Sequence, residues 1–219
     1  MEDESQVVDP RSAYRRAKVE HYLRQAEEYL AMGRYLTAQK ILETIRSIEP
    51  ENEECSNLKG ILSERLYVIQ HRNNGVTASS EAEPKKHRPE LVMIVDQDER
   101  VLTELCEGLR RYGFHTICAA SYDEAIASLT TVSPDIIVSE VNFETGSRGF
   151  DLFFWVKTNE TMRHVPFIFL AARIDREMLI AGKRFGVDDL IQKPADHDVV
   201  TASIVNSISL RKKTAPSGS

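Results

Sequence analysis

Acidic, amide and lysine side chains follow short apolar stretches at several points of this sequence. In Pro134–Phe143, PDIIVSEVNF, a run of apolar residues that indicates a buried strand ends at the carboxylate of Glu140. Asp96, Gln97 and Asp98 follow another apolar run, and Lys193 follows a third. Carboxylates near a lysine can bind a charged ligand or form an ion pair. Which of these occurs depends on the elements that carry the residues.

Strand-like and helix-like stretches alternate five times from Leu91 onward. The strand-like stretches are LVMIV, HTICAA, DIIVS, PFIFLAA and DDLIQKP. Such alternation predicts a doubly wound parallel sheet with right-handed crossovers. Ligands of these sheets bind at the carboxyl ends of the strands. We therefore expect the residues at these ends to lie along one edge: Asp96, Gln97 and Asp98 as an acidic pocket, with Glu140, Ala171 and Lys193.

Four motifs in order, IVDQD, PDIIVSEV, FIFLAA and GVDDLIQKP, resemble the receiver domain of two-component response regulators over Leu91–Ile208. The resemblance implies an α/β, flavodoxin-like, five-stranded doubly wound parallel sheet of order 2-1-3-4-5. It also implies phosphoryl transfer to an Asp on the third strand. In the family, two acids hold Mg²⁺, a Thr or Ser hydroxyl binds the phosphoryl group, a Lys offsets its charge, and an aromatic in the last strand changes rotamer.

This sequence departs from the family pattern at several of these positions. Glu140 occupies the phosphoacceptor position, and Gln97 occupies the second acid position, after Asp96. Ala171 and Leu190 replace the hydroxyl and the switching aromatic. Lys193 is kept, Asn142 could still offer a backbone carbonyl, and Asp98 is placed to cap the helix that follows. Gln is a poor ligand for Mg²⁺, and a nucleophile displaced by about 1.5 Å, one carbon–carbon bond, loses reactivity.

These substitutions predict a degenerate receiver that has given up phosphoryl transfer. We expect no enzymatic activity, no catalytic residue, no metal and no cofactor. Glu140 could pair with Lys193 as a structural ion pair beside Asp96, or it could mimic the phosphorylated state permanently. The predicted function is a signalling adaptor that acts by protein–protein interaction. The alternative is a phosphorylation-responsive single-domain regulator that accepts a phosphoryl group from a histidine kinase with Mg²⁺.

The N-terminal part of the chain is predicted to be helical. GRYLTAQKILETIRSIEP resembles the second half of a tetratricopeptide repeat, and the predicted helical domain covers residues 11–71. Gly60 lies 34 residues after Ala26, which suggests a second repeat that is never completed. One and a half repeats are too few for a stable array, so this domain must cap itself, dimerise or pack on something else. A plain three-helix hairpin without a ligand is the other interpretation.

Composition limits location and partners. Residues 1–10 and 211–219 are predicted to be disordered and 72–89 to be a linker, with the receiver-like domain at 90–210. The net charge of −6 argues against a nucleic-acid partner. We expect neither a signal peptide nor a membrane span. Cys55, Cys106 and Cys118 are odd in number, far apart and not spaced like metal ligands, which favours a reduced, cytoplasmic chain.

The expected partners are proteins. The predicted interaction surface comprises Tyr22 and Tyr29 of the helical domain and Arg173, Met178 and Lys183 of the receiver-like domain. In the family the fourth and fifth receiver helices commonly form a dimer face. The last three of these residues belong to that face, with Asp175 and Arg176, so a homodimer is possible. No DNA-binding or catalytic motif follows the last helix, and contact with other proteins is therefore the expected mode of action.

Overall fold

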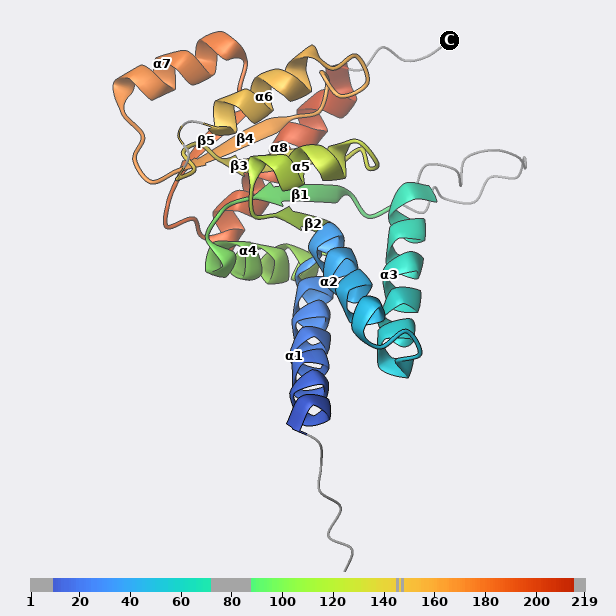
Figure 1. Ribbon diagram of the computed structural model, residues 1–219. Helices are drawn as coiled ribbons and strands as arrows, with labels where there is room; N and C mark the ends of the chain where they lie inside the picture. Colours follow the sequence, from blue (N-terminus) through green and yellow to red (C-terminus); the bar gives the residue numbers. More distant parts are fainter. Residues whose placement is uncertain (1–9, 72–87, 145, 147, 215–219) are drawn as a thin grey trace, which may run out of the picture. The chain divides into compact units, whose positions relative to one another are not determined.

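The computed structural model describes residues 10–71, 88–144, 146 and 148–214 (Figure 1). They form two compact units, which divide in the sequence between Val68 and Ile69. Each unit has its own elements and its own buried side chains. Among the described residues, no helix is both long enough and apolar enough to cross a membrane.

The N-terminal unit consists of three helices, α1 (Pro10–Met32), α2 (Tyr35–Ile48) and α3 (Glu53–His71). Only Gly33 and Arg34 separate α1 from α2, and Gly33 has a φ of 79°, a conformation that glycine adopts without strain. The side chains that the three helices bury recur at helical spacing: Val19, Leu23, Ala26, Leu30, Tyr35, Ala38, Leu42, Ile45, Cys55, Leu58 and Leu62. The helical prediction for this part of the chain is therefore correct.

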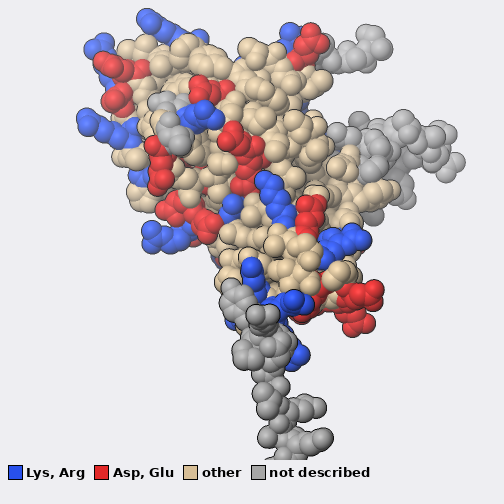
Figure 2. Space-filling view, viewed as in Figure 1, with Lys and Arg blue, Asp and Glu red and all other residues tan. Residues whose placement is uncertain are grey.

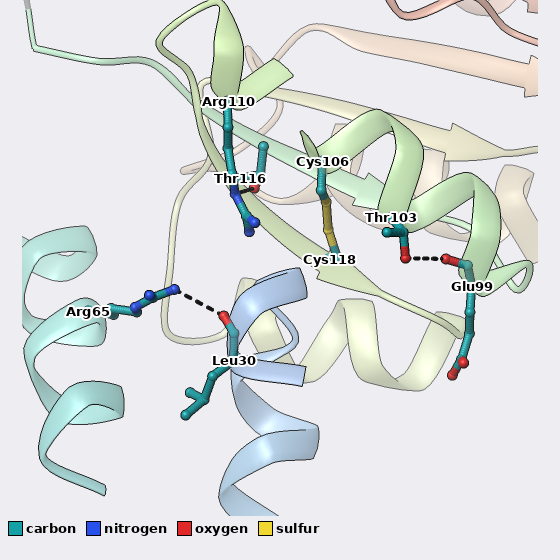
Figure 3. The surroundings of a disulfide bond; sticks show 8 residues. All are labelled: Leu30, Arg65, Glu99, Thr103, Cys106, Arg110, Thr116 and Cys118. Atoms are coloured by element: carbon teal, nitrogen blue, oxygen red, sulfur yellow. Dashed lines mark hydrogen bonds between the residues drawn. A yellow bond between two sulfur atoms is a disulfide. The ribbon is translucent and has the colours of Figure 1, made fainter. Parts of the chain in front are cut away.

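Polar contacts fix the ends of these helices. The side chain of Asn52 accepts a hydrogen bond from the N–H of Cys55 at 2.8 Å and so caps the start of α3. Arg65 of α3 donates from Nη1 to the carbonyl oxygen of Leu30 at 3.0 Å (Figure 3). The last turn of a helix has carbonyl groups without intrahelical partners, so this contact satisfies one of them at the end of α1.

The C-terminal unit is a five-stranded parallel sheet with the strand order β2-β1-β3-β4-β5. The strands are β1 (Leu91–Val95), β2 (His115–Ala119), β3 (Ile136–Glu140), β4 (Phe167–Ala171) and β5 (Asp189–Gln192). The helices are α4 (Glu99–Arg111), α5 (Tyr122–Leu129), α6 (Arg148–Thr158), α7 (Arg176–Phe185) and α8 (His197–Thr214). This topology confirms the predicted doubly wound sheet of order 2-1-3-4-5.

Helices cover both faces of the sheet (Figure 1). On one face, the apolar sides of α4 and α8 share a core with side chains of the strands, among them Val92, Ile94, Leu102, Val138 and Ile204. On the other face, Phe153 of α6 packs against Phe167 and Phe169 of β4, with ring centroids 5.3 and 5.9 Å away. A sheet buried on both faces explains why β1, β3 and β4 have no alternation of polar residues.

The prediction of reduced cysteines is wrong for one pair. Cys106 of α4 and Cys118 of β2 form a disulfide, with their Cα atoms 7.6 Å apart (Figure 3). Both residues belong to the core between α4 and the sheet, so packing places them together although 12 positions separate them in the sequence. Arg110 and Thr116 join the same two elements by a hydrogen bond of 2.9 Å. Cys55 is free and buried.

The C-terminal helix is longer than predicted. It continues to Thr214, past Leu210, because Arg211 and Lys212 favour helix and contact the body of the unit. Arg211 donates to the carbonyl oxygen of Asp135 at 3.4 Å, and Lys212 pairs with Glu90 at 2.9 Å. Among the predicted disordered and linker segments, residues 1–9, 72–87 and 215–219 lie outside the described residues.

Candidate functional site

Four strand ends meet at one edge of the sheet. In the register of the parallel pairs, Val95 lies beside Ser139, Glu140 beside Leu170, and Ala171 beside Gln192. The residues that end or follow these strands, Asp96, Glu140, Ala171 and Lys193, are thereby brought to one place. Local hydrogen bonds hold two of them, since the N–H of Asp96 donates to Ala119 at 3.1 Å and that of Lys193 to Ala171 at 2.8 Å.

One ammonium group lies between two buried carboxylates at this edge. Lys193 Nζ forms ion pairs with Oδ2 of Asp96, at 2.5 Å, and with Oε2 of Glu140. The side chain of Asp96 is fully buried, that of Glu140 is 6% exposed and that of Lys193 is 18% exposed. When all three groups are ionised, the cluster carries a net charge of −1.

Glu140 also binds the backbone that follows it. Its Oε1 accepts hydrogen bonds from the N–H groups of Val141 at 2.9 Å and Asn142 at 3.1 Å. The carboxylate therefore has two backbone donors on one oxygen and the ammonium group of Lys193 on the other. An anion held by donors and a cation in this way gains charge-assisted hydrogen bonds. The longer side chain of Glu allows its carboxylate to fold back over its own strand end.

The pKa values of Asp96 and Lys193 are shifted by burial and by their contacts. Loss of solvent raises the pKa of Asp96, while Lys193 and the N–H of Asp98, which donates to Asp96 Oδ1 at 2.9 Å, oppose the rise. For Lys193, burial by itself lowers the pKa, but the bonds and attraction from Asp96 and Glu140 are stronger and raise it above its ordinary value. The lysine is thus held in its charged form.

Gln97 and Asp98, the other two polar residues after β1, form hydrogen bonds outside the cluster of Asp96, Glu140 and Lys193. Asp98 is the N-cap of α4, where its carboxylate accepts from the N–H of Arg100 at 2.9 Å, and this bond lowers its pKa. Gln97 Oε1 accepts from the N–H of Glu144 at 2.7 Å, which joins the β1–α4 turn to the chain after β3. Mg²⁺ needs a near-octahedral set of oxygen ligands. With Asp96 on Lys193 and Gln97 on Glu144, the residues as arranged do not fit Mg²⁺.

The two substituted switch positions, Ala171 and Leu190, carry apolar side chains that are at least half-buried. Ala171 ends β4 and is fully buried, and it offers only a methyl group beside the charged cluster. Leu190 of β5 is half-buried and packs on Gly182 of α7, where an added Cβ would lie 2.8 Å from Leu190 Cδ1. Leu190 therefore fills the space beside α7 with a side chain that can form no hydrogen bond.

The predicted interaction residues lie in two different units. Tyr22 and Tyr29 of α1 are half-buried, and the guanidinium group of Arg34 lies 4.5 Å from the centre of the Tyr29 ring. In the C-terminal unit Arg173 and Lys183 are exposed at α7, whereas Met178 is half-buried. Two of the five predicted residues therefore belong to the N-terminal unit and three to the C-terminal unit.

Sequence reasoning missed one residue of the site, Gly149. A Cβ at this position would lie 2.2 Å from the carbonyl oxygen of Glu140 and 2.7 Å from that of Val141. Only glycine lets α6 begin this close to the end of β3. The signal was present in the loop NFETGSRG, whose glycines lie near a predicted strand end, but a close approach between backbones cannot be read from one sequence.

One group of possible metal ligands was also not predicted. Ligand atoms of Asp196, His197 and Asp198 lie within 4.8 Å of one another at the start of α8. Each residue has a structural role: Asp196 accepts from the N–H of Asp198 at 2.7 Å, Asp198 accepts from the hydroxyl of Tyr112, and His197 packs on Gly108. The positive end of the helix dipole, moreover, disfavours a cation here. We therefore assign these residues to the structure of α8.

The C-terminal unit is similar in sequence to known proteins. The chain is 26% identical over 113 residues to the sensory transduction protein BceR of Halalkalibacterium halodurans, and 28% identical over 113 residues to the phosphate regulon transcriptional regulatory protein PhoB of Escherichia coli. These matches cover 52% of this chain and 47% and 49% of the two relatives. The chain thus spans about half the length of the curated relatives it matches.

Among solved structures, a response regulator from Desulfuromonas acetoxidans is 26% identical, with a TM-score of 0.51, and the match covers 55% of this chain and 98% of that one. These comparisons correct one prediction. The relatives include PhoB and YxdJ, which are named as transcriptional regulatory proteins. The exclusion of a nucleic-acid partner, which rested on net charge and on the lack of a DNA-binding motif, is therefore not supported. The sequence model of the response regulator receiver domain matches residues 92–205, slightly more than half of the chain, and the chain belongs to that family.

Proposed function

We propose that this protein is a signalling adaptor in which the phosphoacceptor position of a receiver domain is occupied by a permanent internal anion. The proposal assigns it no catalytic step and no cofactor. Signals would pass through contacts with other proteins, independently of phosphorylation. The placement of the chain in the cytoplasm remains a prediction.

The observation that carries the proposal is the set of contacts around Glu140. Its carboxylate accepts hydrogen bonds from the N–H groups of Val141 and Asn142. It also forms an ion pair with Lys193, which pairs with Asp96 as well. In the receiver family, the lysine after the fifth strand offsets the charge of the phosphoryl group. Here the side chain of Glu140 already provides the negative charge that this lysine would balance. This supports a site held in one state.

Three further positions agree with a fixed state. Gln97 binds Glu144 rather than facing the carboxylates, so the site has only one acid after β1 beside Glu140. Ala171 has no hydroxyl group, and Leu190 is packed on Gly182. A phosphoryl group at this edge would find no side-chain hydroxyl at the end of β4 and no aromatic group to reorient in β5.

A second candidate function is phosphorylation-responsive regulation, and the retained pair of Asp96 and Lys193 favours it. These two residues lie together at the strand ends, as the family chemistry requires, 2.5 Å apart. In that case an acid of the cluster would accept a phosphoryl group with Mg²⁺. Two observations argue against this candidate. The charged groups of Asp96, Glu140 and Lys193 already contact one another, and the second acid that the family uses to hold Mg²⁺ is replaced by Gln97.

The N-terminal helices supply the second half of the proposal. Their buried stripes and the short turn at Gly33 support the resemblance to a tetratricopeptide repeat, which is a protein-binding fold. Tyr22 and Tyr29, half-buried with Lys18 and Arg34 over their rings, would offer aromatic contacts to a partner. The receiver surface at Arg173, Met178 and Lys183 would offer a separate contact.

Binding of a phosphoryl analogue tests this proposal. Thermal unfolding of the full chain is measured with Mg²⁺, with beryllium fluoride, and with both. We expect the same midpoint in all three, because Glu140 already occupies the donors. The triple variant Glu140→Asp, Gln97→Asp, Ala171→Thr should be stabilised only when both are present. A native protein that is stabilised by both together, but by neither alone, would favour the phosphorylation-responsive candidate instead.

A further inference from the structure

Basic side chains gather at the amino ends of the strands, the edge of the sheet opposite the candidate site. They come from the segments before β1 and β4 and from the last turns of α6 and α8. Seven residues form this group, which we call the basic edge: Arg88, Lys157, Arg163, His164, Arg211, Lys212 and Lys213. Because the strands are parallel and all start at this edge, segments far apart in the sequence meet here.

Contacts with the starts of β3 and β4 hold three of these cations in place. Arg88 pairs with Oδ1 of Asp135 at 2.9 Å, and Arg211 donates to the carbonyl oxygen of the same residue at 3.4 Å. Lys157 Nζ donates to the carbonyl oxygen of Val165 at 2.8 Å. Asp135 directly precedes β3 and Val165 lies two residues before β4, and these strands are neighbours in the sheet. The three cations therefore lie along neighbouring strand starts.

The positive charges of the basic edge are close enough to repel one another. Burial lowers the pKa of His164, and repulsion by three cations lowers it further: Arg211, Lys157 and Arg163. Lys157 is affected in the same way, because burial and repulsion from Arg211 lower its pKa against attraction from Asp188. The potential at this edge is therefore positive, although the chain as a whole carries a net charge of −6.

Acidic residues of the same region offset only part of this charge. The six Lys and Arg side chains of the basic edge are accompanied by four acidic ones: Glu90, Asp135, Glu160 and Asp188. In the pair of Arg88 with Asp135, the basic side chain is 43% exposed and the acidic one 15%. In the pair of Lys212 with Glu90, the corresponding values are 55% and 22%. Both pairs thus bury the acid more deeply than the base and present their positive charge to solvent.

We propose that the basic edge binds the phosphate backbone of double-stranded nucleic acid. Arg163 and Lys213 are exposed and form no ion pair with a described residue, so both can contact phosphate oxygens. Interfaces with nucleic acid are more polar and more basic than interfaces between proteins, in which Lys is depleted. The seven residues include no Phe, Tyr or Trp on which unpaired bases could stack, so a duplex fits better than a single strand. Such binding adds a second class of partner to the protein contacts proposed above, and it does not depend on phosphorylation.

Binding should be weak and should depend strongly on salt. The net charge of −6 and the mixture of basic and acidic side chains on the face shown in Figure 2 provide no general attraction for a polyanion. Fluorescence anisotropy of a labelled DNA duplex of about 20 base pairs and arbitrary sequence, titrated with the full chain, measures the affinity. We expect a dissociation constant of about 10–100 µM at about 50 mM salt. With contacts to about four phosphates, the affinity should fall roughly 100-fold between about 50 and about 200 mM salt.

Two double variants separate the basic edge from the charge of the whole chain. Arg163→Glu with Lys213→Glu should raise the dissociation constant at least about tenfold. This variant should unfold at the native temperature, because neither side chain has an ion pair with a described residue to lose. Lys40→Glu with Arg100→Glu is the matched control, since it changes the net charge equally at exposed positions of α2 and α4. The control should alter the dissociation constant by less than about twofold.

A polyglutamate chain is the competing probe, and the native protein should bind it more weakly than the duplex at equal salt. Binding of polyglutamate as tight as that of the duplex would assign the basic edge to acidic proteins and overturn the proposal. A native chain that does not bind the duplex at about 50 mM salt would also overturn it. So would native affinity in the variant with Arg163→Glu and Lys213→Glu, or an equal loss of affinity in the control.

Discussion

Lys193 and Glu140 form an ion pair at the edge of the sheet, and the same ammonium group also contacts Asp96. The lysine is the only cation of this cluster, so the two partners should not be equally important for stability. Lys193→Met would leave two buried carboxylates without a counter-charge and should cost about 3–5 kcal/mol in the free energy of unfolding. Glu140→Gln keeps an acceptor for the two backbone N–H groups and should cost about 1–2 kcal/mol.

Urea unfolding at pH 7 followed by circular dichroism compares the two variants. The pKa of Lys193 is raised above 10.5 in the folded chain, so its contribution is complete below pH 10.5 and is lost as the pH rises through the folded pKa. Lys193→Met should abolish this alkaline loss. Equal destabilisation by the two substitutions would show that Lys193 does not serve both acids.

Asp96→Asn should stabilise the fold at neutral pH. Burial raises the pKa of Asp96 above 3.8, so the folded chain binds this proton more tightly than the unfolded chain. The contribution of Asp96 to the free energy of unfolding therefore decreases as the pH rises from 3.8 to the pKa of the folded chain. Above that pKa the destabilisation by the ionised Asp96 is complete. The variant removes that cost and leaves Lys193 paired with Glu140 alone, which should add about 1–2 kcal/mol at pH 7.

Thermal unfolding of wild type and Asp96→Asn over a pH series measures this difference. The advantage of the variant should shrink as the pH falls and should vanish below about 3.8, where both chains carry a neutral group. A variant less stable than wild type at pH 7 would mean that the pair of Asp96 and Lys193 outweighs the burial of the carboxylate.

Gly149→Ala should be far more damaging than an alanine elsewhere. The new Cβ would lie 2.2 Å from the carbonyl oxygen of Glu140, a backbone atom that cannot move without displacing the end of β3. We expect a loss of about 2–4 kcal/mol. Gly60→Ala is the matched control, because a Cβ there meets nothing within 4 Å, and this variant should gain about 0.5–1 kcal/mol from helix propensity. Chemical denaturation of both variants gives the comparison.

Gln97→Leu tests whether this residue joins two loops or binds a metal. The substitution removes the acceptor for the N–H of Glu144, which should cost about 0.5–1.5 kcal/mol and loosen the chain after β3. Hydrogen exchange should be faster at Glu144 in the variant. Added Mg²⁺ should stabilise neither protein. Stabilisation by Mg²⁺ in wild type, lost in Gln97→Leu, would instead identify Gln97 as a metal ligand.

The fold of the C-terminal unit could be predicted because its signals are local and repeated. Runs such as LVMIV and FIFLAA are continuous and apolar, which is the pattern of strands covered on both faces. The carboxyl ends of parallel strands lie at one edge of the sheet. Asp96, Glu140 and Lys193, which end or follow three of these strands, lie together as this geometry requires. The N-cap at Asp98 also rests on a local rule, a short acceptor just before a helix.

What the sequence could not provide depends on distances between elements far apart in the chain. The sequence indicates that Gln97 is a poor metal ligand, but it does not indicate that Gln97 binds Glu144. That hydrogen bond exists because the loop after β1 meets the loop after β3. Cys106 and Cys118 look unrelated until α4 packs on β2. The close approach at Gly149 and the packing of Leu190 on Gly182 are likewise contacts between segments, and spacing along the chain does not encode them.

The central claim is that Glu140 makes phosphorylation unnecessary and prevents it. The most direct test is the intact mass of the full chain after incubation with Mg²⁺ and a small-molecule phosphodonor, with Glu140→Asp alongside. We predict that the native protein gains no phosphoryl group. If only Glu140→Asp is labelled, Glu140 alone closes the site, and if neither is labelled, the losses at Gln97 and Ala171 suffice. A native protein that gains one phosphoryl group would contradict the account.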